Sequence, residues 1–84
     1  MDYTIYILRR AQSELAELPR GIYERVRDAI RGLAQDPRPP GCLKLKEREG
    51  WRIRIGNYRV IYEIDDEQQT VTVLHVGHRR DVYR

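Results

Sequence analysis

The sequence predicts an α+β fold of two layers, in which a helical hairpin covers a mostly antiparallel sheet. Three observations carry this prediction: an apolar strand at the N-terminus, two amphipathic helical stretches after it, and a run of alternating residues in the second half. The expected order is β-α-α-β-β-β-β, with both helices on one face of the sheet. A chain of 84 residues is predicted to form one domain, residues 1–84, with a single small core.

The first half of the chain supplies the N-terminal strand and both helices. Residues 3–8 are β-branched, aromatic and apolar on both faces, which predicts a strand that is not a free edge of the sheet. Apolar residues three and four positions apart predict a short helix from Arg9 that Pro19 stops, and a second helix over residues 21–34. Three prolines within residues 36–41 predict a stiff, extended linker back to the sheet.

The stretch from Trp51 to Tyr62 predicts a tight hairpin, because two alternating runs flank the turn residues Gly56 and Asn57. The expected register pairs Ile55 with Tyr58, Arg54 with Arg59, Ile53 with Val60, Arg52 with Ile61 and Trp51 with Tyr62. One face is then apolar, while the other carries three arginines. Like charges across a ladder are destabilising, so this face predicts an anionic partner.

Two further strands are expected beside the hairpin. Residues 43–46 alternate and predict a short strand, in which Lys44 and Lys46 either extend the positive surface or solvate an exposed edge. Residues 70–76 are apolar on both faces, which predicts a central strand.

The C-terminal residues are predicted to complete the basic surface. Gly77 follows the buried strand, and a bend there would deliver His78, Arg79 and Arg80 beside the hairpin arginines. Tyr83 is close enough in sequence to fold back over the same place. Alternatively, Tyr83 is an aromatic residue that covers the edge of the core.

Composition limits the class of protein. The net charge is +3, and all cationic residues except Lys44 and Lys46 are arginines. Arginine suits phosphate recognition, although the codon composition of a genome also produces arginine-rich proteins. The single Cys42 excludes an internal disulfide. With no signal peptide and no membrane-spanning stretch, the sequence predicts a cytoplasmic protein that is mature as the whole chain.

The residue types at this predicted site exclude several reactions. There is no serine or cysteine nucleophile beside a base, no pair of carboxylates, and no cluster of metal ligands, so neither a metal nor another cofactor is expected. Arginines can hold a phosphate and stabilise a phosphoryl transition state. RNA brings its own nucleophile, the 2′-hydroxyl, which needs a base and a proton donor. Tyr83 and His78 are the candidate acid–base groups.

The hairpin from Trp51 to Tyr62 and the ending from Val76 to Tyr83 together resemble the RelE/ParE superfamily of toxins, specifically its RelE branch. The shared pattern is Gly-x-Tyr-Arg, two apolar residues and Tyr, followed by Val-Gly, a basic residue, Arg and a tyrosine near the end. The resemblance implies the toxin of a type II toxin–antitoxin system. It implies a metal-independent endoribonuclease that cleaves messenger RNA in the ribosomal A site.

The resemblance also implies roles for individual residues. Arg59 and Arg79 would hold and stabilise the scissile phosphate, and Tyr83 would act as a base on the 2′-hydroxyl or stack on a nucleobase. Arg52 and Arg54 stand where the family often has lysine. A lysine can protonate the leaving oxygen, whereas arginine does so poorly.

Four further residues complete the predicted site. His78 is the substitute proton donor if its ring faces the arginines. Together with Lys44, Lys46 and Arg80, it is predicted to contact RNA.

The resemblance further implies a RelB-like antitoxin as partner, with messenger RNA and the ribosome, including 16S rRNA near the A site, as targets. The antitoxin is expected to be acidic where it meets the toxin, partly disordered when free, and able to form a heterotetramer. Two alternatives remain open: a ParE-like toxin that inhibits gyrase, and a toxin-fold binding module with weak or no catalysis.

Overall fold

The structure, a computed structural model, describes residues 2–78. Its helices and strands follow the predicted order: β1 (Thr4–Ile7), α1 (Arg9–Ala16), α2 (Arg20–Gly32), β2 (Leu43–Lys44), β3 (Trp51–Ile55), β4 (Tyr58–Asp65) and β5 (Thr70–His78). Within the described residues, no helix is long and apolar enough to cross a membrane.

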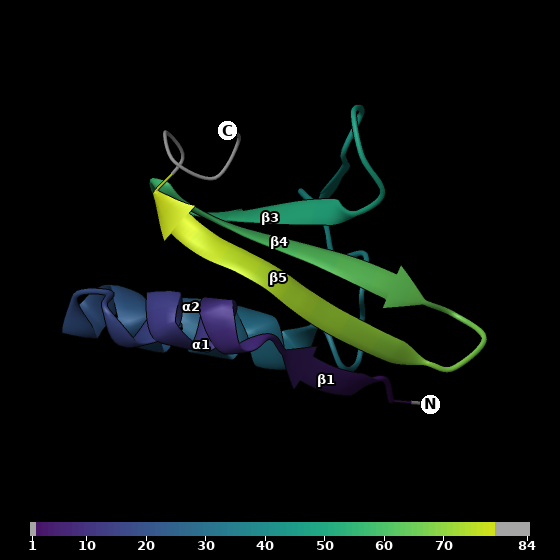
Figure 1. The fold of residues 1–84 in the computed structure, drawn as a ribbon, viewed down its shortest axis with the longest axis horizontal. Coiled ribbons are helices and arrows are strands. Elements are labelled where there is room, and N and C mark those ends of the chain that lie inside the picture. The colour runs from purple at the N-terminus through teal and green to yellow at the C-terminus, as the bar shows by residue number, and fades with distance from the viewer. Residues whose placement is uncertain (1, 79–84) are drawn as a thin grey trace.

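The strands form one sheet in the order β1-β5-β4-β3-β2. β1 runs parallel to β5, and all other neighbours are antiparallel. Both helices lie on one side of the sheet, and α1 runs next to β5 (Figure 1). The predicted two-layer α+β architecture is therefore confirmed.

The core lies between the helices and the sheet. The predicted apolar stripes of both helices are confirmed. α1 ends at Ala16, three residues before the predicted stop at Pro19, and Pro19 is the N-cap of α2. The buried apolar cluster draws on both layers: Ala11, Leu15, Val26, Ile30, Leu33, Ile53, Ile55, Val60, Tyr62, Val71, Val73 and Val76. All of its strand residues share the helix-facing side of the sheet, which leaves the other side for the hairpin arginines.

The central hairpin has the predicted register in all five pairs, from Trp51 with Tyr62 to Ile55 with Tyr58. Gly56 adopts φ +59°, whereas Asn57 is not in the left-handed region. A positive φ at only the first turn residue is the pattern of a type II′ turn, which favours glycine there and matches the twist of the strands.

The prediction for the N-terminal strand is wrong in one respect. β1 is an edge strand, because β5 is the only strand of residues 2–78 that pairs with it, and Tyr6 is 55% exposed. Ile5 and Ile7 are partly buried against the core. Tyrosine counts as an apolar residue, but its side chain can remain exposed to solvent. A strand with apolar residues on both faces therefore need not be buried on both faces.

The C-terminal strand also differs from the prediction. Gly77 lies within β5 and pairs with Arg59, so the expected bend after Val76 is absent. Tyr62 pairs with Val73 and Ile61 with His75, which leaves one β5 residue between them as a β-bulge. Because successive strand residues alternate faces, one extra residue reverses the faces of all residues that follow it.

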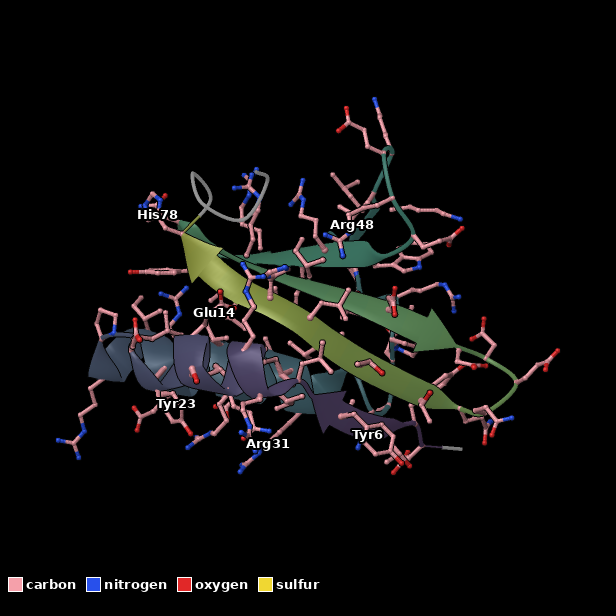
Figure 2. The ribbon with its side chains drawn as sticks, viewed as in Figure 1. Tyr6, Glu14, Tyr23, Arg31, Arg48 and His78 are labelled. Atoms are coloured by element: carbon pink, nitrogen blue, oxygen red, sulfur yellow. The ribbon has the colours of Figure 1, made fainter. Side chains whose placement is uncertain are left out.

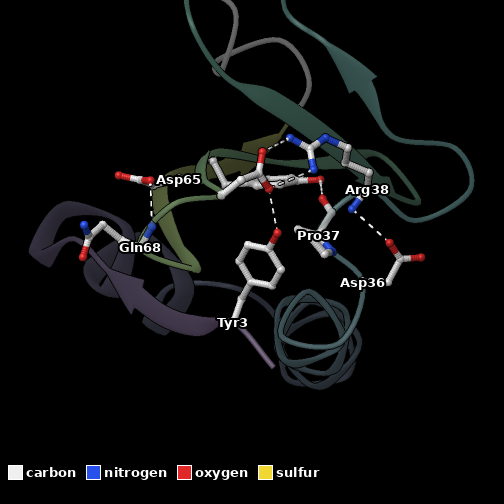
Figure 3. Close-up of polar contacts among 8 residues, drawn as sticks. Tyr3, Asp36, Pro37, Arg38, Asp65 and Gln68 are labelled. Carbon is white, nitrogen blue, oxygen red and sulfur yellow. Dashed lines mark hydrogen bonds and ion pairs between the residues drawn. The ribbon is translucent and has the colours of Figure 1, made fainter. Parts of the chain in front are cut away.

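The proline-rich linker carries neither helix nor strand, as predicted, and side-chain contacts fix it to the sheet (Figure 3). The buried Tyr62 hydroxyl donates a hydrogen bond to the Pro37 carbonyl at 2.8 Å. Arg38 binds both oxygens of Asp66, at 2.9 and 3.3 Å, and the Tyr3 hydroxyl donates to the same carboxylate at 2.6 Å. These contacts join the linker, the residue that precedes β1, and the β4–β5 turn.

Candidate functional site

The hairpin register places Arg52, Arg54 and Arg59, here called the arginine face, on the side of the sheet that points away from the helices. Arg54 and Arg59 are direct partners across the ladder. On its other side Arg59 pairs with Gly77, so no β5 side chain stands opposite it. Three strands therefore contribute to this face, with guanidinium groups from two of them.

The arginine face is not evenly exposed. Arg52 is 9% exposed and Arg59 is 6% exposed, whereas Arg54 lies in solvent. Within residues 2–78, no carboxylate lies at ion-pair distance from Arg52 or Arg54. Charge in a recessed position acts more strongly on a bound anion than charge in open water, because the local dielectric constant is lower. This arrangement can bind and stabilise a phosphate.

The two lysines of the predicted surface lie elsewhere. Lys44 pairs with Trp51, and its ammonium is 6.0 Å from the centroid of that ring. Trp51 belongs to the helix-facing side of the hairpin, so Lys44 does not extend the arginine face. Lys46 is exposed and lies beyond the end of β2. Since β2 is an edge strand, the placement of Lys44 agrees with the alternative that lysine solvates an edge.

His78 is turned away from the arginine face by the bulge in β5. It pairs with Tyr58, and the two rings pack edge to face with centroids 5.6 Å apart. Tyr58 alternates with Arg59 along β4 and so lies on the opposite side of the sheet. The His78 ring therefore does not face the arginines in this arrangement, as a role of His78 as proton donor would require.

The second half of the predicted site, Arg79, Arg80 and Tyr83, lies outside the described residues. The roles of these residues remain predictions. Gly77 and His78 are the last described positions before them, and Gly77 pairs with Arg59 at the end of β5.

A cleft beside α1 was not predicted from the sequence. Its volume is about 360 Å³, and it is lined by Arg10, Glu14, Glu17, Leu18, Pro19, Tyr58, His75, Val76, Gly77 and His78. Glu14 extends from α1 toward the sheet (Figure 2). In the sequence, Glu14 and Glu17 both lie between the apolar residues of an amphipathic helix, and no local signal distinguishes one from the other.

Metal binding finds no support in this part of the chain. Among residues 2–78, no group of three or more histidine, cysteine, aspartate or glutamate side chains is placed to hold a metal ion.

Comparisons with known proteins give a consistent assignment. The family described as "ParE toxin of type II toxin-antitoxin system, parDE" matches residues 5–83. The toxin RelG of Mycobacterium tuberculosis is 38% identical over 86 residues, which cover 100% of this chain and 99% of that protein.

Solved structures agree with the sequence relatives. The toxin in the RelBE2 toxin–antitoxin complex of Mycobacterium tuberculosis superposes with a TM-score of 0.81 and 34% identity, over 94% of this chain and 100% of that one. The archaeal RelE–RelB complex of Pyrococcus horikoshii gives a TM-score of 0.84 and 26% identity, over 98% of this chain and 100% of the other. With its β-α-α-β-β-β-β sheet and its arginine hairpin, the chain belongs to the RelE/ParE superfamily, as a RelE-family toxin of a type II toxin–antitoxin system.

Proposed function

We propose that this toxin is a ribosome-dependent endoribonuclease of the cytoplasm. It cleaves messenger RNA in the ribosomal A site and needs no metal ion. The single observation that carries the proposal is the arginine face. Arg54 and Arg59 are paired across two strands, beside a glycine of the third. Such an array suits one phosphate group with negative charge that grows during reaction.

The reaction would use the RNA as its own nucleophile. The 2′-hydroxyl attacks the adjacent phosphate, a P–O bond forms to the 2′-oxygen, and the bond to the 5′-oxygen breaks. The products are a 2′,3′-cyclic phosphate and a 5′-hydroxyl, so one proton must leave the nucleophile and one must reach the leaving oxygen. Arg59 and Arg79 are assigned to the phosphate, and Tyr83 to the 2′-hydroxyl proton or to base stacking.

Arg52 and Arg54 are assigned to charge stabilisation of the phosphate. A guanidinium keeps its proton throughout the accessible pH range, so neither is a strong proton donor. His78 packs on Tyr58. It is therefore a weaker candidate for protonating the leaving 5′-oxygen than the sequence alone indicated. The geometry favours a mechanism in which electrostatic stabilisation of the leaving oxygen carries more of the effect than protonation.

The proposed partner is a RelB-like antitoxin. Related toxins have been crystallised with RelB, among them those of Mycobacterium tuberculosis and Pyrococcus horikoshii. An antitoxin that neutralises this chain would need acidic or polar groups at the arginine face and could form a heterotetramer with the toxin. The proposed targets are the A-site codon and the 16S rRNA around it.

The decisive experiment adds the purified toxin to programmed ribosomes and maps the 5′ ends of the messenger RNA. Cleavage within the A-site codon is expected when ribosomes are present, and no cleavage is expected without them. Tyr83→Phe is expected to slow the cleavage step with little loss of RNA binding. Tyr83→Phe keeps the aromatic ring, so a wild-type cleavage rate in this variant, together with a loss of RNA binding in Tyr83→Ala, would assign Tyr83 to stacking instead.

A second candidate function is inhibition of DNA gyrase, because the matching family description is that of the ParE toxin. The named relative and the solved structures reported above are RelG and RelE toxins, which favours RNA cleavage. A supercoiling assay with gyrase separates the two. Intact messenger RNA together with failed supercoiling would replace the first proposal with the second. If both assays are negative, the weakly catalytic binding module remains.

A further inference from the structure

The outer edge of β5 changes its neighbour halfway along. β1 covers it from Thr70 to Val73, through the parallel pairs that end with Ile7. The Leu8 amide then donates to the Val73 carbonyl at 3.0 Å, and the chain enters α1. β5 continues to His78 with no strand of the described chain on this side. Its outward-pointing backbone groups therefore need other partners.

Glu14 supplies one of these partners. Its Oε1 accepts a hydrogen bond from the Val76 backbone N–H at 2.9 Å. Its Oε2 lies 3.8 Å from Nδ1 of His75 and 3.7 Å from Nε of Arg10. The Glu14 side chain is 31% exposed, so this carboxylate binds the strand from a partly shielded position. A helix side chain thus replaces the missing strand where β1 has ended.

The segment that Glu14 holds is the β5 part of the candidate site. His75 pairs with Ile61, and Gly77 pairs with Arg59. Val76 lies between them, with its side chain in the core and its N–H on Glu14. A shift of this edge would move the backbone that faces Arg59, and displacements of about 1 Å at a reaction centre can cost a hundredfold in rate.

We propose that Glu14 is a positioning residue of the arginine face. It contacts no substrate; it acts through the Val76 amide by fixing the end of β5 against β4, and His75 steadies the carboxylate from the strand side. This inference rests on the proposed RNA cleavage. It predicts that the carboxylate oxygen matters more than its charge, because the contact to the backbone is a hydrogen bond.

Four variants separate this role from general effects of charge and stability. Glu14→Ala removes the acceptor, and Glu14→Asp keeps the charge but withdraws the oxygen by one methylene. Glu14→Gln keeps an acceptor oxygen at the same reach without the charge. Glu17→Ala is the matched control, since Glu17 lies one turn further along, lines the same cleft and is exposed.

Two measurements are made on each full-length variant: hydrogen exchange of the Val76 amide, and single-turnover cleavage over a range of ribosome concentrations. Glu14→Ala and Glu14→Asp are expected to lose Val76 protection and to cleave about ten- to a hundredfold more slowly. The ribosome concentration at half-maximal rate should change less than about twofold, because positioning affects the reaction and not the binding. Glu14→Gln should restore both properties, and Glu17→Ala should resemble the wild type.

The outcomes distinguish this inference from the proposed function. If the wild type cleaves and both short-side-chain variants cleave equally fast, Glu14 positions nothing and the inference is overturned. Unchanged Val76 protection in those variants would show that the hydrogen bond does not hold the strand. If the wild type itself does not cleave, the proposed function fails and takes the positioning role with it. Should Glu14→Ala fail to fold, Glu14→Asp decides.

Discussion

Two arginines lie near opposite ends of β4, Arg38 of the linker and Arg54 of β3, and the structure holds them in opposite ways. Near the β4–β5 turn, Arg38 binds both oxygens of Asp66 and lies 5.0 Å from the ring centroid of Trp51. Near the hairpin turn, Arg54 is exposed, and no carboxylate of the described chain lies at ion-pair distance from it. One end carries a neutralised cross-link, whereas at the other end the exposed Arg54 has no carboxylate of residues 2–78 beside it.

The difference shows why a count of arginines does not predict an anion site. Hydrogen bonds from Arg38 and Tyr3 hold the pKa of Asp66 below its ordinary value, and the pKa of Arg38 is raised mainly by its hydrogen bond to Asp66. The charge of Arg38 is thus used within the fold. Arg54 has its charge available for a ligand, because the ladder places it beside Arg59 and not beside an acid.

The largest effect is expected for Arg59→Ala, which should reduce the cleavage rate at least about a hundredfold and relieve growth inhibition. The change removes the positive charge that stabilises the negatively charged phosphate in the transition state. The measurement is single-turnover cleavage on ribosomes, together with growth after induction. Arg79→Ala should also relieve growth inhibition. Arg38→Ala, from the opposite end of the strand, should still cleave.

Because Arg59 is only 6% exposed, its replacement needs a check of the fold by thermal unfolding. Arg59→Lys keeps the charge and loses the planar fork, so an intermediate rate is expected. Full toxicity of a folded Arg59→Ala protein would remove Arg59 from the site.

A smaller effect is expected for Arg54→Ala on the salt dependence of RNA binding. Each phosphate contact contributes to the slope of log affinity against log salt concentration, so losing one contact should reduce that slope by about 1. Arg38→Ala should leave the slope unchanged, since Asp66 already neutralises that guanidinium. Equal slopes for wild type and Arg54→Ala would show that exposure alone does not make this arginine a phosphate ligand.

At the neutralised end, Tyr62→Phe should lower stability while sparing cleavage at temperatures where the protein is folded. The change removes a buried hydrogen bond to Pro37 and leaves its carbonyl without that donor, which costs about 1–3 kcal/mol. For a chain of this size, each kcal/mol corresponds to a drop of about 4–8 °C in Tm. Tyr6→Phe, on an exposed residue, is the matched control. Equal Tm values for the two variants would contradict a role for the Tyr62 hydroxyl in fixing the linker.

The smallest effect is expected for Asp66→Asn, and it should depend on pH. A carboxyl whose folded pKa is lowered contributes stability that is fully present above its unfolded pKa, about 4, and is lost as pH falls through the lower folded value. Wild type should therefore exceed Asp66→Asn in Tm at neutral pH, and the difference should vanish in acid. A difference that stays constant between neutral and acidic pH would rule out the ionised pair as its source.

The fold and part of the site could be predicted because their signals are local. The hairpin register depends on a period-2 pattern and a two-residue turn, so Arg52, Arg54 and Arg59 were placed on one face correctly. The helix stripes depend on spacing of three and four residues. The edge position of β1 could not be predicted in this way, because the sequence of one strand does not determine whether one or two other strands pair with it.

Sequence by itself determined the order of elements, the apolar stripes and the three arginines that share a face. Only the tertiary structure decided where the neighbouring groups point. One extra residue in β5 turns His78 toward Tyr58. Because β1 ends at Ile7, the Val76 amide has no strand partner among residues 2–78 on that side and donates its hydrogen bond to Glu14. Both outcomes depend on pairing between segments far apart in the chain, and the periodicity within a single segment does not contain that information.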